Sequence, residues 1–248
     1  MNNSSDNKGK KILGYLFPGL ITLLVMLIVL AAKGIWPFGS SRIDLFDNMQ
    51  QVAPLYAHLW DAMHGDASIW FDWYTGLGTN VSMSMSAFSM ISPFNLSLYL
   101  CPRDYILEFI SVLTVIKTFV MSVTMYAFIN KRYNSLSYNI KALFAVAYAF
   151  CGYVLLYASC FTPWMDIVAL FPLLMMALDV MEKTGKKLFY IIMVAVMFII
   201  NYYLAAMSLV YILLVGGMYL IFMCDKKERR KKAWNVGIGT FTGIALSA

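Results

Sequence analysis

The chain has 248 residues, of which 61% are hydrophobic and only 13% are charged, and its mean hydropathy is +0.70. This composition excludes an ordinary water-soluble enzyme or binding domain. The net charge of +6 does not indicate a nucleic-acid partner, because the basic residues form short clusters between apolar blocks. Blocks of about twenty apolar residues can cross the bilayer as helices, so we predict an all-α polytopic membrane protein of the cell membrane.

The first segment predicts a membrane anchor. Residues 1–11 are polar and include three lysines, and an apolar run follows them. That run is too long for the core of a secretory signal peptide, and no clear cleavage site comes after it. Because basic residues favour the cytoplasmic side, we assign three regions: a cytoplasmic N-terminus at 1–11, a first transmembrane helix at 12–33 and an external loop at 34–82.

Further apolar blocks follow the external loop. Clusters of Lys and Arg separate alternate blocks at 131–141, 183–187 and 225–232, and we place these clusters in the cytoplasm. The gaps at 160–166 and 201–203 then lie outside. The apolar blocks are 105–130, 142–159, 167–181, 188–204, 205–224 and 233–248.

Residues 83–104 need a separate interpretation. Their serines, Pro93 and Asn95 would make a poor lipid-facing helix, so we predict a re-entrant or interfacial segment. Without it the chain has seven spans, and its last residue lies outside. The bundle at 105–248 ends inside an apolar stretch, from which we infer a truncated last helix and a longer natural protein.

The external loop concentrates the polar chemistry of the chain. It holds both histidines, four of the six tryptophans and five aspartates against one basic residue. One polar stripe recurs at spacings of four, three, four and three residues, and an apolar stripe from Leu45 to Met63 lies opposite it. We therefore predict amphipathic interfacial helices, divided at a proline. The polar stripe consists of Asp47, Gln51, Pro54, His58 and Asp61.

This polar stripe has two interpretations. It could be the solvated face of an interfacial helix, with the tryptophans as an ordinary aromatic belt. Alternatively, its carboxylates, amide and imidazole could form a site in which an aspartate acts as general base. Asp47, His58, Asp61 and His64 could also hold a divalent metal, although such mixed and scattered ligands make a weak signal.

Two charged residues beside or within later spans also leave alternatives. Asp166 could complement the N-terminus of its helix or face the same cleft as Asp47. Lys117 lies inside an apolar block, where it could pair with a carboxylate, bind a lipid phosphate or extend toward the membrane surface. Extension toward the surface is the interpretation that the sequence favours.

Several short motifs, in order, resemble the YfhO-type bacterial membrane proteins. Each is weak alone, and their order and spacing over most of the chain make the resemblance specific. The sequence departs from the family pattern at Val52, where an aromatic residue is common, and at Thr79, where a glycine is common. The matching motifs are Asp47 with Gln51, Asp61, residues 76–80, residues 92–95, Lys131 with Arg132, residues 152–153, residues 164–166, and residues 201–203 with Met207.

The resemblance implies a C-type (GT-C-like) glycosyltransferase bundle with interfacial helices in the first external loop. The implied partners are membrane lipid, a polyprenyl-phosphate sugar donor and an extracytoplasmic cell-envelope glycopolymer, such as lipoteichoic acid. Asp47 is the position that matches the catalytic base. No cofactor is implied with certainty. The expected substrate contacts are Gln51, His58, Asp61, Trp164, Asp166, Asn201, Tyr202, Arg42 and Arg103, with the arginines facing the carrier phosphate.

Two other classes of function remain open from the sequence. A lipid or polymer transporter, or a non-catalytic membrane partner of an envelope-modifying enzyme, would also be a helical membrane protein. Transporters often contain internal repeats and broken helices at the bilayer midplane, and we find no repeat here. A structural scaffold is the third class, and it predicts that the acidic stripe tolerates alanine.

Overall fold

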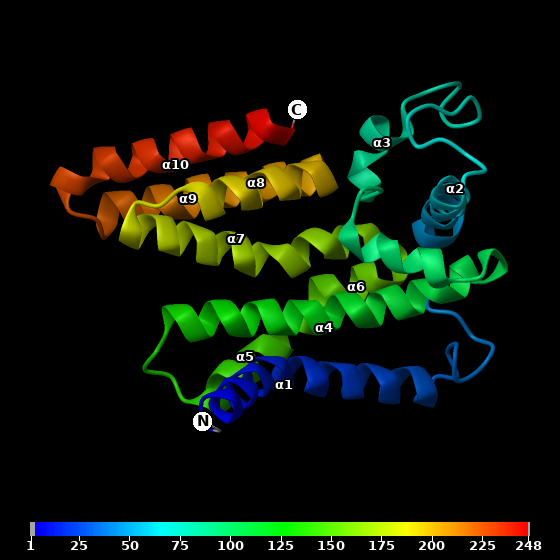
Figure 1. The fold of residues 1–248 in the computed structure, drawn as a ribbon, viewed down its shortest axis with the longest axis horizontal. Coiled ribbons are helices and arrows are strands. Elements are labelled where there is room, and N and C mark those ends of the chain that lie inside the picture. Colours follow the sequence, from blue (N-terminus) through cyan, green and yellow to red (C-terminus); the bar gives the residue numbers. More distant parts are fainter. Residues whose placement is uncertain (1–2, 248) are drawn as a thin grey trace.

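A computed structural model describes residues 3–247, with side chains described from residue 12 onward except that of Ser84. The side chains of the N-terminal lysines and the last residue, Ala248, lie outside the described residues. The described chain is helical and contains no β-strand. Its long helices run roughly alongside one another, as an all-α bundle (Figure 1).

Five helical stretches are long and apolar enough to cross a membrane: 12–32, 103–132, 138–160, 162–184 and 202–222. The third is interrupted, because Cys151 is extended and Gly152 follows it. The helices that form these stretches are α1 (Asn3–Ala32), α4 (Ile106–Arg132), α5 (Tyr138–Ala149), α6 (Gly152–Cys160), α7 (Met165–Thr184) and α9 (Tyr202–Phe222).

Two of the seven predicted spans fall on helices outside these five stretches. Helix α8 (Leu188–Ile200) has 13 residues, so its length is about 20 Å, less than a hydrocarbon core. Helix α10 (Lys226–Ser247) begins with six basic residues among its first seven positions. The predicted gap at 201–203 coincides with the break between α8 and α9. Asn201 has extended backbone and caps α9 by accepting a hydrogen bond from Leu204 N at 3.0 Å, so α9 begins at Tyr202.

Helix α4 lies at the centre of one part of the bundle, where it contacts α1, α5 and α7. Helix α10 packs on α8 through two glycines. A Cβ atom added at Gly243 would lie 2.6 Å from Val194 Cβ, and one at Gly239 would lie 2.9 Å from the Tyr190 ring. Glycine therefore allows the two helices to approach closely, as small residues do between membrane helices.

The two ends of the bundle differ in charge. At the end that we call the basic end, the turns 133–137, 185–187 and 223–225 lie together (Figure 1). There Asp179 pairs with Arg132 and with Lys183. The opposite end, called the loop end, carries the segment between α1 and α4. The positive-inside rule predicts that the basic end faces the cytoplasm.

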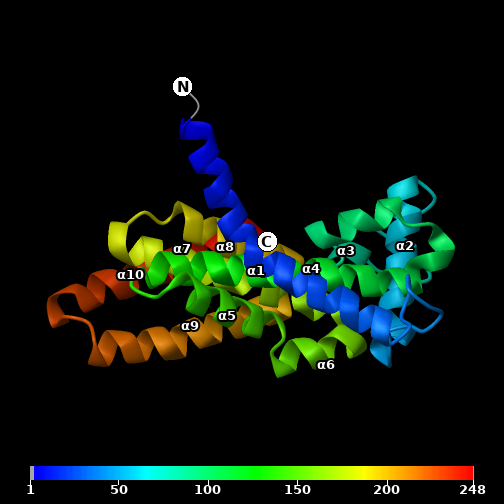
Figure 2. The same ribbon diagram turned by 90° about the horizontal axis from the view of Figure 1, so that it is seen from below.

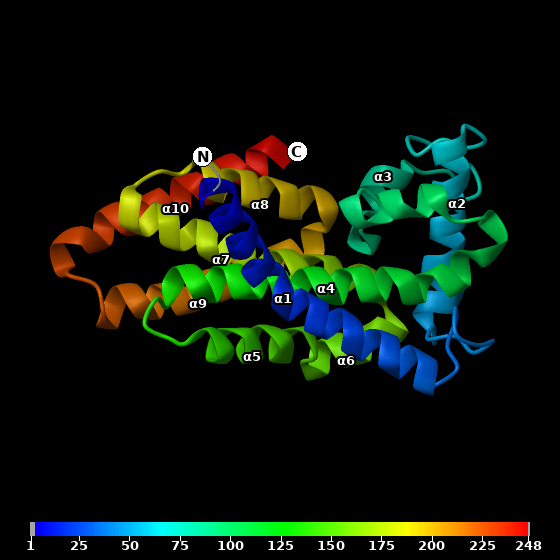
Figure 3. The same cartoon turned by 60° about the horizontal axis from the view of Figure 1, so that its bottom comes forward.

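The loop end is built from short helical pieces. Helix α2 runs across the direction of the long helices (Figures 2 and 3). The segment predicted to be re-entrant or interfacial is not one helix, and its polar residues Ser89, Ser92 and Asn95 are buried against protein. The pieces are η1 (Asn48–Val52, a π-helical turn), α2 (Ala53–His64), α3 (Val81–Ser84), and the 3-10 turns η2 (Ser86–Phe88), η3 (Pro93–Leu100) and η4 (Arg103–Tyr105).

Candidate functional site at the loop end

The amphipathic pattern of 45–63 forms a helix whose buried face differs at its start from the predicted stripe. Val52, Tyr56 and Leu59 are buried as expected, whereas Leu45 and Met49 are exposed. The π-helical turn explains the difference, because its wider i→i+5 bonding, seen in Ala53 N to Asn48 O, shifts the register by about one residue. Asn48 is therefore buried on the face where Met49 was expected.

Helix α2 itself follows the sequence rules. Pro54 occupies its first turn, where a missing backbone N–H costs nothing. Gly65 ends the helix with φ of 91°, a left-handed conformation suited to glycine. The buried face of α2 packs into a cluster that includes Val81, Leu98 and Leu113, so it faces protein.

Asp47, the predicted base, lies directly before η1 at a sharp bend. The preceding Phe46 has φ of 48°, which is uncommon for a residue other than glycine. The Asp47 side chain is partly exposed, and its Oδ1 accepts a hydrogen bond of 2.8 Å from Gln51 Nε2, one helical turn later. The structure therefore brings Asp47 and Gln51 together at the surface of the loop end.

Asp61 and Arg103 form a second group of predicted site residues. The Arg103 guanidinium donates to both carboxylate oxygens of Asp61, at 2.6 and 2.8 Å. This bond to Arg103 lowers the pKa of Asp61 from its usual value. The pair ties α2 to η4, and both side chains are partly exposed.

The two histidines lie in different surroundings. His58 Nε2 lies 3.0 Å from Ser68 O, and its Nδ1 lies 4.0 Å from Asp72. His64 is stacked between the rings of Trp60 and Tyr99, with centroid distances of 3.7 and 4.7 Å. Within the part of the chain that the structure describes, no three His, Cys, Asp or Glu side chains are grouped closely enough to hold a metal ion.

Arg42, the other predicted phosphate contact, already has acidic neighbours. Its Nε lies 3.5 Å from Asp44 Oδ1, and its Nη1 lies 3.9 Å from Glu108 Oε1. The Asp44 side chain is only 1% exposed, whereas that of Arg42 is 40% exposed. A phosphate at Arg42 or Arg103 would therefore compete with carboxylates.

Asp166 and Lys117 form a fully buried ion pair. Lys117 Nζ lies 2.6 Å from Asp166 Oδ1, and neither side chain is exposed to solvent. The Lys117 ammonium also donates to Thr162 O at 3.1 Å. The sequence had favoured extension of Lys117 toward the membrane surface. That interpretation was wrong, because a carboxylate on α7 lies within reach inside the bundle.

Helix α2 and the turn at η3 cover this ion pair. The negative charge of Asp166 adds to burial in raising the pKa of Tyr56 well above its ordinary value. Ser92 also contacts Asp166 through its hydroxyl. Asp166 is thus held in a protein interior, whereas the Asp47–Gln51 pair is exposed.

The remaining predicted contacts have mainly packing and capping partners. Trp164 packs against Tyr157, Phe161 and Tyr203, with ring centroids 4.8 to 5.8 Å away. Asn201 is fully buried, and its amide donates to Ala87 O at 2.7 Å and to Ser89 Oγ at 3.1 Å. Tyr202 is 51% exposed.

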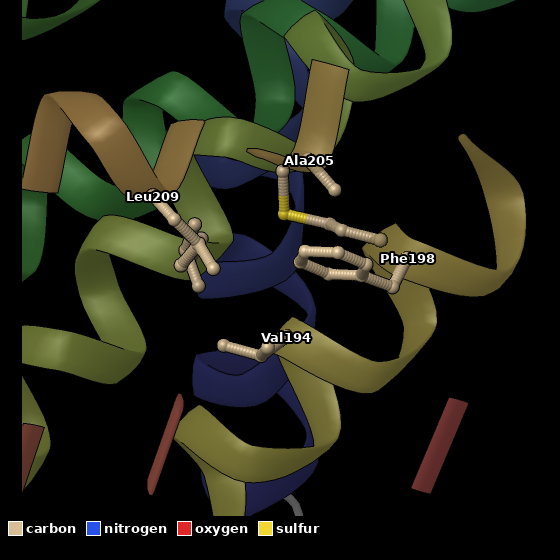
Figure 4. A pocket seen from close by; sticks show the side chains of 6 residues that line it. Val194, Phe198, Ala205 and Leu209 are labelled. Carbon is tan, nitrogen blue, oxygen red and sulfur yellow. The ribbon is translucent and has the colours of Figure 1, made fainter. Parts of the chain in front are cut away.

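An apolar pocket lies away from these groups, between α7, α8 and α9 (Figure 4). The side chains of Val194, Phe198, Ala205 and Leu209 face one another across it. It has no room for a water-sized molecule, and its lining carries no polar side chain. It is therefore a gap in helix packing, and none of the predicted site residues lines it.

Comparison with known proteins confirms the family resemblance of the sequence. A family model described as "Bacterial membrane protein YfhO" matches residues 19–248. No curated protein and no solved structure matches the chain. Because the family match extends from within α1 to the last residue, the chain belongs to the YfhO family of bacterial membrane proteins.

Proposed function

We propose that this protein is a membrane glycosyltransferase that moves a sugar from a polyprenyl-phosphate carrier to an extracytoplasmic cell-envelope glycopolymer similar to lipoteichoic acid. One observation carries the proposal. Asp47 follows the first candidate span, is partly exposed, and is oriented by Gln51 at an end of the bundle where a helix lies across the others. Family membership and the predicted external position of this end support the same assignment.

In the proposed reaction, Asp47 removes the proton from an acceptor hydroxyl. The hydroxyl oxygen then attacks the anomeric carbon of the donor sugar, the bond from that carbon to the carrier phosphate breaks, and the configuration inverts. The carrier phosphate leaves with the bonding electrons and needs a cation nearby. Gln51 Nε2 donates to Asp47 Oδ1 at 2.8 Å, which favours one orientation of the carboxylate.

Arg103 and Arg42 are the proposed cations for the carrier phosphate. Both are partly exposed, and both lie against carboxylates that compensate their charge before a donor arrives. A phosphate is a good bidentate partner for a guanidinium, so it could replace a carboxylate at either residue. His58, Asp61, Trp164, Asp166, Asn201 and Tyr202 stay predicted substrate contacts, although Asp166 and Asn201 are fully buried.

The direct test is transfer of radiolabelled sugar from polyprenyl-phosphate donors to envelope polymer by the purified protein in proteoliposomes. Asp47→Asn should lower the rate by about 10²- to 10⁴-fold, the usual contribution of a general base. Asp66→Asn is the matched control, because Asp66 is an exposed carboxylate of the same loop. Unchanged activity of Asp47→Asn would exclude Asp47 as the base.

The transporter alternative predicts a different result in the same vesicles. Movement of the polyprenyl-phosphate donor across the bilayer, with no sugar transferred, would favour a transporter. Transfer that requires Asp47 would favour the enzyme.

A further inference from the structure

Asn48, the residue after the proposed base, has an unusually complete set of contacts. It is fully buried, and its Nδ2 donates to Ser159 O at 2.8 Å and Thr162 Oγ1 at 3.0 Å. Its Nδ2 also lies 3.3 Å from Ala158 O. In return, its Oδ1 accepts a hydrogen bond of 2.8 Å from Thr162 N. The donor and acceptor groups of this amide are thus both used.

These contacts cap the C-terminal end of α6. The last carbonyls of a helix have no partner within the helix, and a buried carbonyl without a partner is costly. Asn48 supplies a donor to Ala158 and Ser159, and Leu45 N supplies a second donor to Ser159 O at 2.8 Å. The chain on either side of Asp47 is therefore bonded to the connection between α6 and α7.

Thr162, the main partner of Asn48, is itself fixed to the bundle. Its carbonyl accepts the hydrogen bond from Lys117 of α4, and Lys117 pairs with Asp166 in the first turn of α7. Polar contacts therefore run without a break from Asn48 through Thr162 and Lys117 to Asp166. Groups in such a buried network hold one geometry, because any displacement leaves several of them unpaired.

We propose that Asn48 is a positioning residue. It fixes the backbone of Asp47 to the α6–α7 connection and thereby fixes the position of the Asp47 carboxylate at the loop end. This proposal rests on the proposed function for the role of Asp47. Asn48 acts through Asp47 and takes no part in bond making. Phe46 fits this arrangement, since its positive φ requires support from the contacts around it.

Hydrogen–deuterium exchange of the protein in nanodiscs tests the anchor without any substrate. Asn48→Ala should speed exchange at 44–52 and at 158–162 by at least tenfold, and exchange at 188–200 should not change. Asn130→Ala is the matched control, because Asn130 also has two hydrogen bonds, to Tyr15 and Lys141, but lies at the basic end. It should leave exchange at 44–52 unchanged.

The kinetic test separates positioning from general loss of stability. Asn48→Ala should lower kcat by about 10²-fold with little change in KM, as expected for a misplaced catalytic group. In the Asp47→Asn background the same substitution should have almost no further effect, because the group that it positions is gone. Asn48→Ser, which keeps a hydroxyl for one of the bonds, gives a milder variant if Asn48→Ala does not fold.

Different outcomes would contradict the anchor, the positioning role and the proposed function. Unchanged exchange at 44–52 in both Asn48 variants would overturn the anchor, and rate losses from Asn48 and Asp47 substitutions that multiply would overturn positioning. A wild-type protein that transfers no sugar from any donor would overturn the proposed function. In that case the exchange result would still decide whether Asn48 anchors this segment.

Discussion

Two ion pairs contain a basic residue of the same helical stretch, 103–132, and the nitrogen–oxygen distance is 2.6 Å in both. Their surroundings differ. In the Lys117–Asp166 pair both side chains have 0% exposure, whereas Arg103 and Asp61 are 52% and 24% exposed. At equal distance, burial decides how much each pair matters, because water screens the exposed charges and cannot compensate the buried ones.

The difference also assigns different roles to the two pairs. The buried pair is inaccessible to solvent and holds Thr162, so a substrate could contact Asp166 only if the bundle opened. The exposed pair can exchange one partner at little cost, which suits a guanidinium proposed to bind a carrier phosphate. Four predictions test this difference between the buried and the exposed ion pair.

The largest effect is expected from Lys117→Met. It removes one partner and leaves the Asp166 charge buried, so it should lower the free energy of unfolding by about 3–5 kcal/mol. Unfolding of the detergent-solubilised protein by heat or denaturant measures this loss. The double variant Lys117→Met/Asp166→Leu should recover most of it, since no charge is then buried. If the double variant were as unstable as Lys117→Met, the loss would not come from the buried charge of Asp166.

Tyr56→Phe tests whether the tyrosine hydroxyl supports the buried pair. The Tyr56 hydroxyl is buried and forms no hydrogen bond in the structure. Removing an unpaired buried hydroxyl should therefore raise the free energy of unfolding, by about 1 kcal/mol. The same unfolding measurement applies, and Tyr148→Phe is a control in which a hydroxyl bonded to Val168 O is lost. A destabilised Tyr56→Phe protein would mean that the hydroxyl donates to Asp166.

The sequence predicted the class of fold because apolar blocks of membrane length are a strong signal. The predicted gap at 201–203 matches the break at Asn201, although the apolar blocks were divided between 204 and 205, because hydropathy does not detect a capping asparagine inside an apolar run. Five of the seven predicted spans fall on the long apolar stretches, and the other two fall on α8, which is short, and on α10, which starts with charged residues.

In the candidate site, too, the sequence predicted some contacts and missed others. The spacing of Asp47 and Gln51 predicted that they share a helix face, and they form a hydrogen bond. The partner of Lys117 was not predictable, since Asp166 lies far along the chain and only tertiary packing brings them together. Asn48 was missed because the periodicity assumed an unbroken α-helix. Its spacing of four residues to Val52, and of four more to Tyr56, was the available signal.

Arg103→Gln should change the free energy of unfolding less than Lys117→Met or Tyr56→Phe. Exposed ion pairs contribute about 0.2–1 kcal/mol, and salt weakens them. The loss in the free energy of unfolding should therefore be below about 1 kcal/mol and should shrink as salt is raised toward 1 M, about where the Debye length falls to 3 Å. Under the same salt series the loss in Lys117→Met should persist. Equal salt dependence in the two variants would contradict their different burial.

The smallest effect concerns pH at the exposed pair. The hydrogen bond from Arg103 lowers the pKa of Asp61 in the folded protein. The pair thus stabilises the fold at pH values above about 4, the ordinary value for an aspartate, and this contribution is lost as pH falls through the lowered folded pKa. The difference in the free energy of unfolding between wild type and Asp61→Asn should be constant from pH 8 to pH 6. It should then diminish as the carboxylate is protonated at lower pH. A difference that grows on acidification would mean that the fold favours the protonated form of Asp61. Asp61 would then behave as a buried carboxylate such as Asp166 does, and its exposure would not explain its contribution to stability.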